Sequence, residues 1–100
     1  MAQLDLYCLP RRPGFILEVQ ANLLIGLSTA AVVPLLPQQA DLRILERLNP
    51  VFNIDGIVHV MLTQSIATVP RKELGPPVSS LNSQHYFDVI NALDMLISGS

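Results

Sequence analysis

Residues 51–64 read VFNIDGIVHVMLTQ, and this stretch decides which kind of fold the chain can form. Two runs of strand-forming residues, 51–54 and 57–64, flank the pair Asp55–Gly56. Asp-Gly readily takes the left-handed backbone angles of a tight hairpin turn, so the stretch predicts two antiparallel strands. Such a sheet needs another element to cover its apolar face.

Further strands are predicted on both sides of this hairpin, at 4–9, 15–20, 29–36 and 67–70. RRPG at 11–14 predicts a turn that joins the first two strands into a hairpin. Pro34 has no N–H to donate, so the strand that contains it is expected at a sheet edge or a bulge. Leucines at helical spacing in 38–50, between two prolines, predict a short helix or a helical turn.

The last predicted element is an amphipathic helix that begins after Asn82, a favourable N-cap residue. Its apolar positions recur at helical spacing and are Tyr86, Val89, Ile90, Leu93, Leu96 and Ile97. The opposite side is kept polar by Asp88, Asn91 and Asp94. Antiparallel strands followed by one helix predict an α+β fold, formed by a single domain over residues 1–100.

Composition narrows the class of protein. Half of the 100 residues are apolar and 14% are charged, against roughly 25% charged residues in a typical soluble domain. We therefore expect exposed apolar surface and a homodimer that hides part of it. The net charge of −2 lacks the basic footprint of a nucleic-acid or membrane-surface binder. A single cysteine, no secretory signal and no apolar run long enough to span a membrane predict a cytoplasmic protein.

No group of residues predicts catalysis, a metal site or a cofactor. His59 lies among apolar strand residues and is expected to be structural, whereas His85 is expected to be solvated. Neither has a Cys or His partner at metal-ligand spacing. Cys8 is expected to be a small buried residue. Because the carboxylates are scattered and no Gly-rich phosphate loop is present, the residues favour a binding protein over an enzyme.

Basic residues come in three couples, Arg11–Arg12, Arg43–Arg47 and Arg71–Lys72. The simplest interpretation places all of them on solvated turns and an exposed helical face. A more specific hypothesis is that Arg11 and Arg12, at the tip of a turn, pair with an acidic partner peptide.

Several segments, taken in order, resemble the CcdB family, the toxins of CcdA–CcdB toxin–antitoxin pairs. They are Tyr7, LEVQANLL at 17–24, VVPL at 32–35, NPVFNI at 49–54, MLTQSIATVP at 61–70 and INALDMLISG at 90–99. The resemblance covers essentially the whole chain. It implies a small SH3-like antiparallel β-barrel with an extra small sheet and a C-terminal α-helix, in a homodimer without enzyme activity.

The resemblance also implies partners. Better-known members bind the A subunit of DNA gyrase and trap it on cleaved DNA, and the disordered tail of a CcdA antitoxin removes them. The implied gyrase-facing residues are Leu23, Leu24, Ile25, Asp94, Ser98, Gly99 and Ser100. The implied antitoxin-facing residues are Arg11, Arg12, Asp55 and Gly56.

One part of the implied gyrase surface departs from the family pattern. The best-known toxin has Trp-Gly-Ile where this sequence has Ser98, Gly99 and Ser100, and asparagine where it has Asp94. Serine lacks the buried area of a terminal tryptophan, which is a typical interface hot spot. The alternatives are therefore a member with weak or no gyrase poisoning, including one that only sequesters antitoxin, and a MazF-like ribonuclease toxin. Low basic content and the missing acid–base cluster disfavour the ribonuclease.

Overall fold

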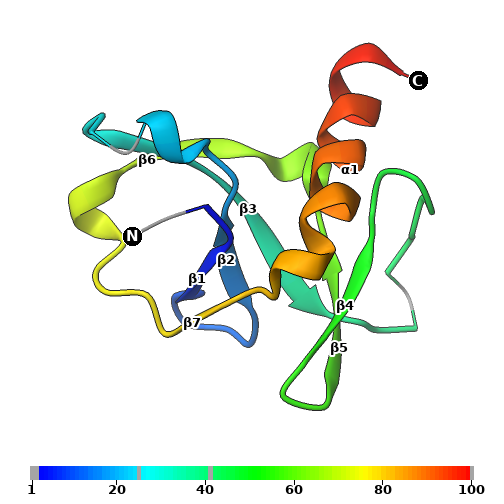
Figure 1. Cartoon of the computed structure of the whole chain (residues 1–100). Helices are drawn as coiled ribbons and strands as arrows, with labels where there is room; N and C mark the ends of the chain where they lie inside the picture. The colour runs from blue at the N-terminus through cyan, green and yellow to red at the C-terminus, as the bar shows by residue number, and fades with distance from the viewer. Residues whose placement is uncertain (1–2, 25, 41, 100) are drawn as a thin grey trace.

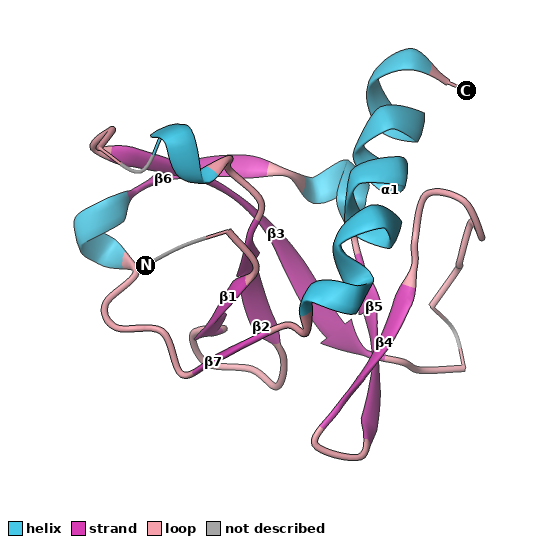
Figure 2. Cartoon of the chain, viewed as in Figure 1, coloured by secondary structure: helices cyan, strands magenta, loops and turns pink. Residues whose placement is uncertain are grey.

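The computed structural model describes residues 3–24, 26–40 and 42–99, and Figure 1 shows a curled antiparallel sheet with one α-helix packed against it. The strands are β1 (Asp5–Cys8), β2 (Phe15–Glu18), β3 (Thr29–Pro37), β4 (Val51–Ile54), β5 (Ile57–Met61), β6 (Ala67–Pro70) and β7 (Ser79–Ser80). The helices, cyan in Figure 2, are the 3₁₀ turns η1 (Asn22–Leu24), η2 (Thr63–Ser65), η3 (Arg71–Glu73) and η4 (Ser83–His85), and the α-helix α1 (Tyr86–Ser98). The predicted α+β class is confirmed.

The sheet has the strand order β4-β5-β3-β2-β1-β7 among the described residues, and β6 also pairs with β3. One edge of β3 pairs with β2, while the other edge pairs with β6 over 29–32 and with β5 over 35–37. Because β3 changes partner along one edge, the sheet curls into a half-barrel. Through β5, the β4–β5 hairpin pairs with the end of β3 and extends the sheet beyond it. The extra small sheet that the family resemblance implies is therefore continuous with the main sheet.

Pro34 lies inside β3, which has neighbours on both edges, so of the two predicted positions, a sheet edge or a bulge, the edge is wrong. The pairing with β6 ends at Val32 and the pairing with β5 begins at Leu35. Pro34 thus falls where η2 interrupts that edge, and its carbonyl accepts the N–H of Leu62 at 3.0 Å. A residue without an N–H is tolerated at this change of partner.

The two predicted hairpins are confirmed, and each depends on a glycine. Asp55 and Gly56 have φ of 54° and 82°, the left-handed pair of a two-residue turn, and Asn53 Oδ1 accepts the Gly56 N–H at 3.0 Å. In the β1–β2 turn, Gly14 has φ of 124°, and a Cβ there would lie 2.4 Å from the carbonyl oxygen of Leu35. No other residue fits that position.

The segment before β4, residues 42–50, forms a single turn and not a longer helix. The N–H groups of Leu48 and Asn49 both donate to the carbonyl of Leu45, at 2.9 and 2.7 Å. The Asn49 side chain is buried; it accepts the Leu45 N–H and donates to the carbonyl of Met61. Leu45 itself is exposed, so the evenly spaced leucines share no buried face that would stabilise a helix.

The hydrophobic core lies between the curled sheet and α1, which contributes Val89 and Ala92. The predicted apolar face of α1 is buried only in part, because Ile97 is 81% exposed and Tyr86 is also exposed. Phe87 adds a further exposed ring on this helix. The C-terminal end of α1 projects beyond the sheet (Figure 1). An apolar flank of the helix is therefore left in solvent.

Two predictions for single residues are wrong. Cys8 is exposed, because it is the last residue of β1 at the entry to the turn. His85 is half-buried, with its ring edge-on against Phe52 at a centroid distance of 4.9 Å. His59 is buried as expected, with Nδ1 2.8 Å from the carbonyl oxygen of Ile57.

Candidate binding surfaces

Residues 21–24 and 26–28 between β2 and β3, here called the leucine loop, expose large apolar side chains. Leu23 is 93% exposed, Leu24 45% and Leu27 50%. No residue of η1, which forms the first part of the loop, is buried. Ile25, also predicted to face gyrase, lies outside the described residues. Clustered leucines that contribute nothing to a core are typical of a surface that binds another macromolecule.

Hydrogen bonds from Gln20 and within the loop itself order the leucine loop. The Gln20 side-chain nitrogen donates to the carbonyls of Leu24 and Thr29, both at 3.1 Å. Its side-chain oxygen accepts the N–H of Ala31 at 3.1 Å. In the loop itself, the Leu27 N–H donates to the Leu24 carbonyl at 3.0 Å. The backbone that carries the leucines is therefore fixed by polar contacts.

A buried polar cluster supports the other end of the loop. The Arg71 guanidinium donates to both carboxylate oxygens of Glu18, and the Tyr7 hydroxyl donates to the same carboxylate at 2.9 Å. Arg71 Nε also donates to the Leu27 carbonyl at 3.3 Å, and the Arg71 backbone N–H donates to the Ser28 carbonyl at 2.8 Å. Burial, and then the hydrogen bond to Glu18, raise the pKa of Tyr7 well above its usual range.

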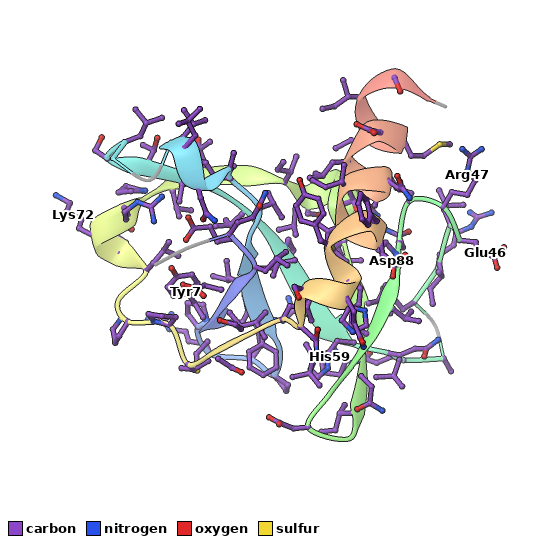
Figure 3. The ribbon with its side chains drawn as sticks, in the orientation of Figure 1. Tyr7, Glu46, Arg47, His59, Lys72 and Asp88 are labelled. Carbon is purple, nitrogen blue, oxygen red and sulfur yellow. The ribbon has the colours of Figure 1, made fainter. Side chains whose placement is uncertain are left out.

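This cluster corrects one interpretation of the sequence, that of Arg71. Glu18, which anchors the cluster, is only 1% exposed. Arg71 was expected on a solvated turn with Lys72, yet its side chain is only 10% exposed. Lys72 does point outward from η3, as Figure 3 shows. Of the basic couple Arg71–Lys72, only Lys72 is solvated.

The helical part of the predicted gyrase surface lies apart from the leucine loop. Asp94, Ser98 and Gly99 are exposed at the end of α1, where the Ser98 hydroxyl donates to the Asp94 carbonyl at 2.7 Å. Gly99 has φ of 73° and caps the helix. Figure 1 places this end of α1 across the molecule from η1, so one chain does not bring the two predicted parts together. Ser100 lies outside the described residues.

Asp94 also lines a hollow of about 440 Å³ between α1 and the turn that precedes β4. Figure 3 shows Glu46, Arg47 and Asp88 on this side of the molecule. The remaining lining residues are Pro50 and Asn91. In the part of the chain that the structure describes, no group of three or more His, Cys, Asp or Glu residues could hold a metal ion.

The predicted antitoxin-facing residues lie on two exposed turns at one end of the molecule, at the bottom of Figure 1. Arg12 lines a hollow of about 180 Å³, and Gly56 lines a second of about 600 Å³. Both are lined by Gln39 and Leu42, so they form one continuous surface. Ile57 on this surface is 55% exposed. The structure therefore joins the two turns through a shallow, partly apolar groove with a cation at one end.

The half-barrel and its C-terminal helix define a small α+β domain that exposes an apolar loop and a shallow groove. The family model described as CcdB protein matches residues 3–99, and the chain belongs to the CcdB family. The family is one of toxins of toxin–antitoxin systems, which act by binding and not by catalysing a reaction. A search of the curated proteins found no match. No helix in the described ranges is long and apolar enough to cross a membrane.

Proposed function

We propose that this chain is a cytoplasmic toxin that binds the A subunit of DNA gyrase, traps gyrase on cleaved DNA, and is neutralised by a CcdA-like antitoxin. The leucine loop is the observation that carries this proposal. It exposes three leucines on a backbone fixed by hydrogen bonds, at the position where the family resemblance locates the gyrase-facing loop. Well-ordered apolar side chains of this kind are suited to insertion into a pocket of a protein partner.

The proposed toxin acts as a homodimer. The exposed flank of α1 supports this, since Tyr86, Phe87 and Ile97 present apolar area that a second copy can cover. A dimer also displays two leucine loops and two helix ends, whereas one chain keeps its own loop and helix end apart.

The antitoxin is proposed to occupy the groove between Arg12 and Gly56. A disordered acidic tail can lie along a shallow surface and place a carboxylate beside the guanidinium of Arg12. The exposed Ile57 offers an apolar contact further along the same surface. This groove is separate from the leucine loop, so the two partners are expected to depend on different residues.

Ser98 favours a second candidate function, a family member that poisons gyrase weakly or not at all. Although Ser98 is exposed, its small side chain lacks the apolar area of a tryptophan, and its hydroxyl is already hydrogen bonded to the Asp94 carbonyl. Such a protein would still bind antitoxin, because the groove does not include the end of α1.

One experiment separates the two functions. The purified chain is titrated with the breakage–reunion domain of gyrase A and, in parallel, with an acidic peptide of the antitoxin tail. Binding of both, with growth arrest on expression that is relieved in a strain whose gyrase is altered at the toxin site, supports the proposed toxin. Peptide binding without gyrase binding would show that gyrase is not the target and leave a sequestering relative.

A further inference from the structure

We propose that Arg71 is the positioning residue of the leucine loop, which it holds in its binding geometry by using the buried Glu18 carboxylate as an anchor. The inference rests on the proposed function, because it names the residue that presents the gyrase-facing leucines. Arg71 does not itself belong to the implied contact surface.

Arg71 makes these contacts with several of its hydrogen-bond donors. Two nitrogens of the guanidinium are directed to Glu18, at 3.3 and 3.1 Å, which leaves Nε to donate to the Leu27 carbonyl. The backbone N–H of Arg71 donates to the next carbonyl, that of Ser28. Lysine has one compact ammonium group and cannot donate to both the Glu18 carboxylate and the Leu27 carbonyl, whereas the planar guanidinium of arginine can.

The leucine loop needs such a support because side-chain packing does not provide one. No residue of η1 is buried, and Leu27 is half exposed. Gln20 holds the loop at the carbonyl of Leu24, and Arg71 holds it at the carbonyl of Leu27. The exposed leucines are therefore carried between two polar supports, one from Gln20, which follows β2, and one from η3.

Fixing the loop before binding lowers the conformational entropy that a complex must remove. Loss of the Arg71 contacts should therefore weaken the partner that uses the loop and leave the partner of the Arg12–Gly56 groove unaffected. A residue that contributes only general stability would affect both partners alike. This difference separates positioning from a merely structural role.

The test compares Arg71→Lys with Lys72→Arg. The first keeps a cation beside Glu18 but loses the Nε–H to Leu27, and the second changes the adjacent exposed cation. In Arg71→Lys we expect the hydrogen-bonded amides of Leu24 and Leu27 to exchange at least about tenfold faster. Affinity for the gyrase A domain should fall about fivefold to tenfold, with antitoxin-peptide affinity unchanged. Lys72→Arg should change neither.

Unchanged exchange at Leu24 and Leu27 would overturn the inference, as would an equal loss of both affinities. Should Arg71→Lys fail to fold, Glu18→Gln supplies the second variant, because it keeps the shape of the anchor and removes its charge. It should accelerate exchange at the same two amides, and unchanged exchange there would also overturn the inference. If the unaltered chain does not bind gyrase, the proposed function is wrong, and the exchange comparison still decides what Arg71 does.

Discussion

Arg71 and Glu18, separated by 53 residues of sequence, form a bidentate ion pair in which Nη2 and Oε2 lie 3.1 Å apart. The pair connects η3 to β2, and Tyr7 brings β1 into the same cluster. Because both charged groups are largely removed from water, the loss of either partner leaves the other buried without its counter-charge. The cluster therefore affects stability as well as the leucine loop.

Arg71→Met should lower the free energy of unfolding by about 3 kcal/mol, because it leaves the Glu18 carboxylate buried and deprived of its cation. Urea denaturation measures the change. Lys72→Met, a matched loss of one cation at the exposed neighbour, should stay within about 0.5 kcal/mol of the unaltered chain. Equal effects of the two substitutions would contradict a buried ion pair.

Tyr7 should make the protein less stable in alkali. Its pKa is raised in the folded state, so its stabilising contribution is complete below the unfolded-state pKa of about 10 and is lost as the pH rises towards the folded-state value. Tyr7→Phe, which keeps the ring and Tyr86, should show a smaller fall in unfolding free energy between about pH 9 and 11. Identical pH slopes for the two proteins would show that Tyr7 does not titrate in this way.

The sequence was sufficient for strands β1 to β6 and the C-terminal helix, because alternation, Asp55–Gly56 and helical spacing are local signals. The two-residue strand β7 was not predicted. At Pro34 the sequence left a sheet edge and a bulge open and could not show the change of partner along β3, which depends on η2, a segment distant in sequence. Before β4 it left a short helix and a helical turn open, and the Asn49 side chain holds a single turn against β5. In both places, tertiary contacts override a local preference.

The candidate surfaces were predictable to different degrees. The excess of leucine in 21–28 could be read directly, and the family resemblance pointed to the same loop. The support under the loop could not be found, because period-two alternation indicates only that Glu18 and Leu17 lie on opposite faces of the strand, and not that Glu18 is buried. Its partner Arg71 was interpreted as one of the two exposed cations of the couple Arg71–Lys72. When an ion pair is buried on the face of a sheet opposite the apolar one, the alternation of apolar and polar residues in a single sequence does not reveal it.

Arg12→Glu should weaken binding of an acidic antitoxin peptide by about tenfold at low salt, because it reverses the charge at one end of the groove. The difference should shrink as salt is added. Calorimetric titration measures both effects. Arg47→Glu makes the same change of charge in the hollow beside α1 and serves as the control. Comparable losses in the two variants would indicate a general charge effect and no binding site at Arg12.

Ser98→Trp should strengthen gyrase binding by about tenfold if the end of α1 is part of the contact, because an indole adds ~150–250 Å² of apolar area there. The hydrogen bond that Ser98 gives up, to the Asp94 carbonyl, is exposed. Ser83→Trp adds the same ring at an exposed position of η4 and should have no effect. An unchanged affinity for Ser98→Trp would exclude this end from the interface.

The most direct test of the proposed function is the affinity of the gyrase A breakage–reunion domain for Leu23→Asp, measured beside Leu45→Asp. Both leucines are exposed, so neither substitution removes a core contact, and the two variants carry the same change of side chain and charge. Leu23→Asp is expected to lower gyrase affinity about thirtyfold or more while antitoxin binding stays unchanged, and Leu45→Asp to alter neither. Equal gyrase affinity for the two variants would contradict a gyrase-binding role for the leucine loop.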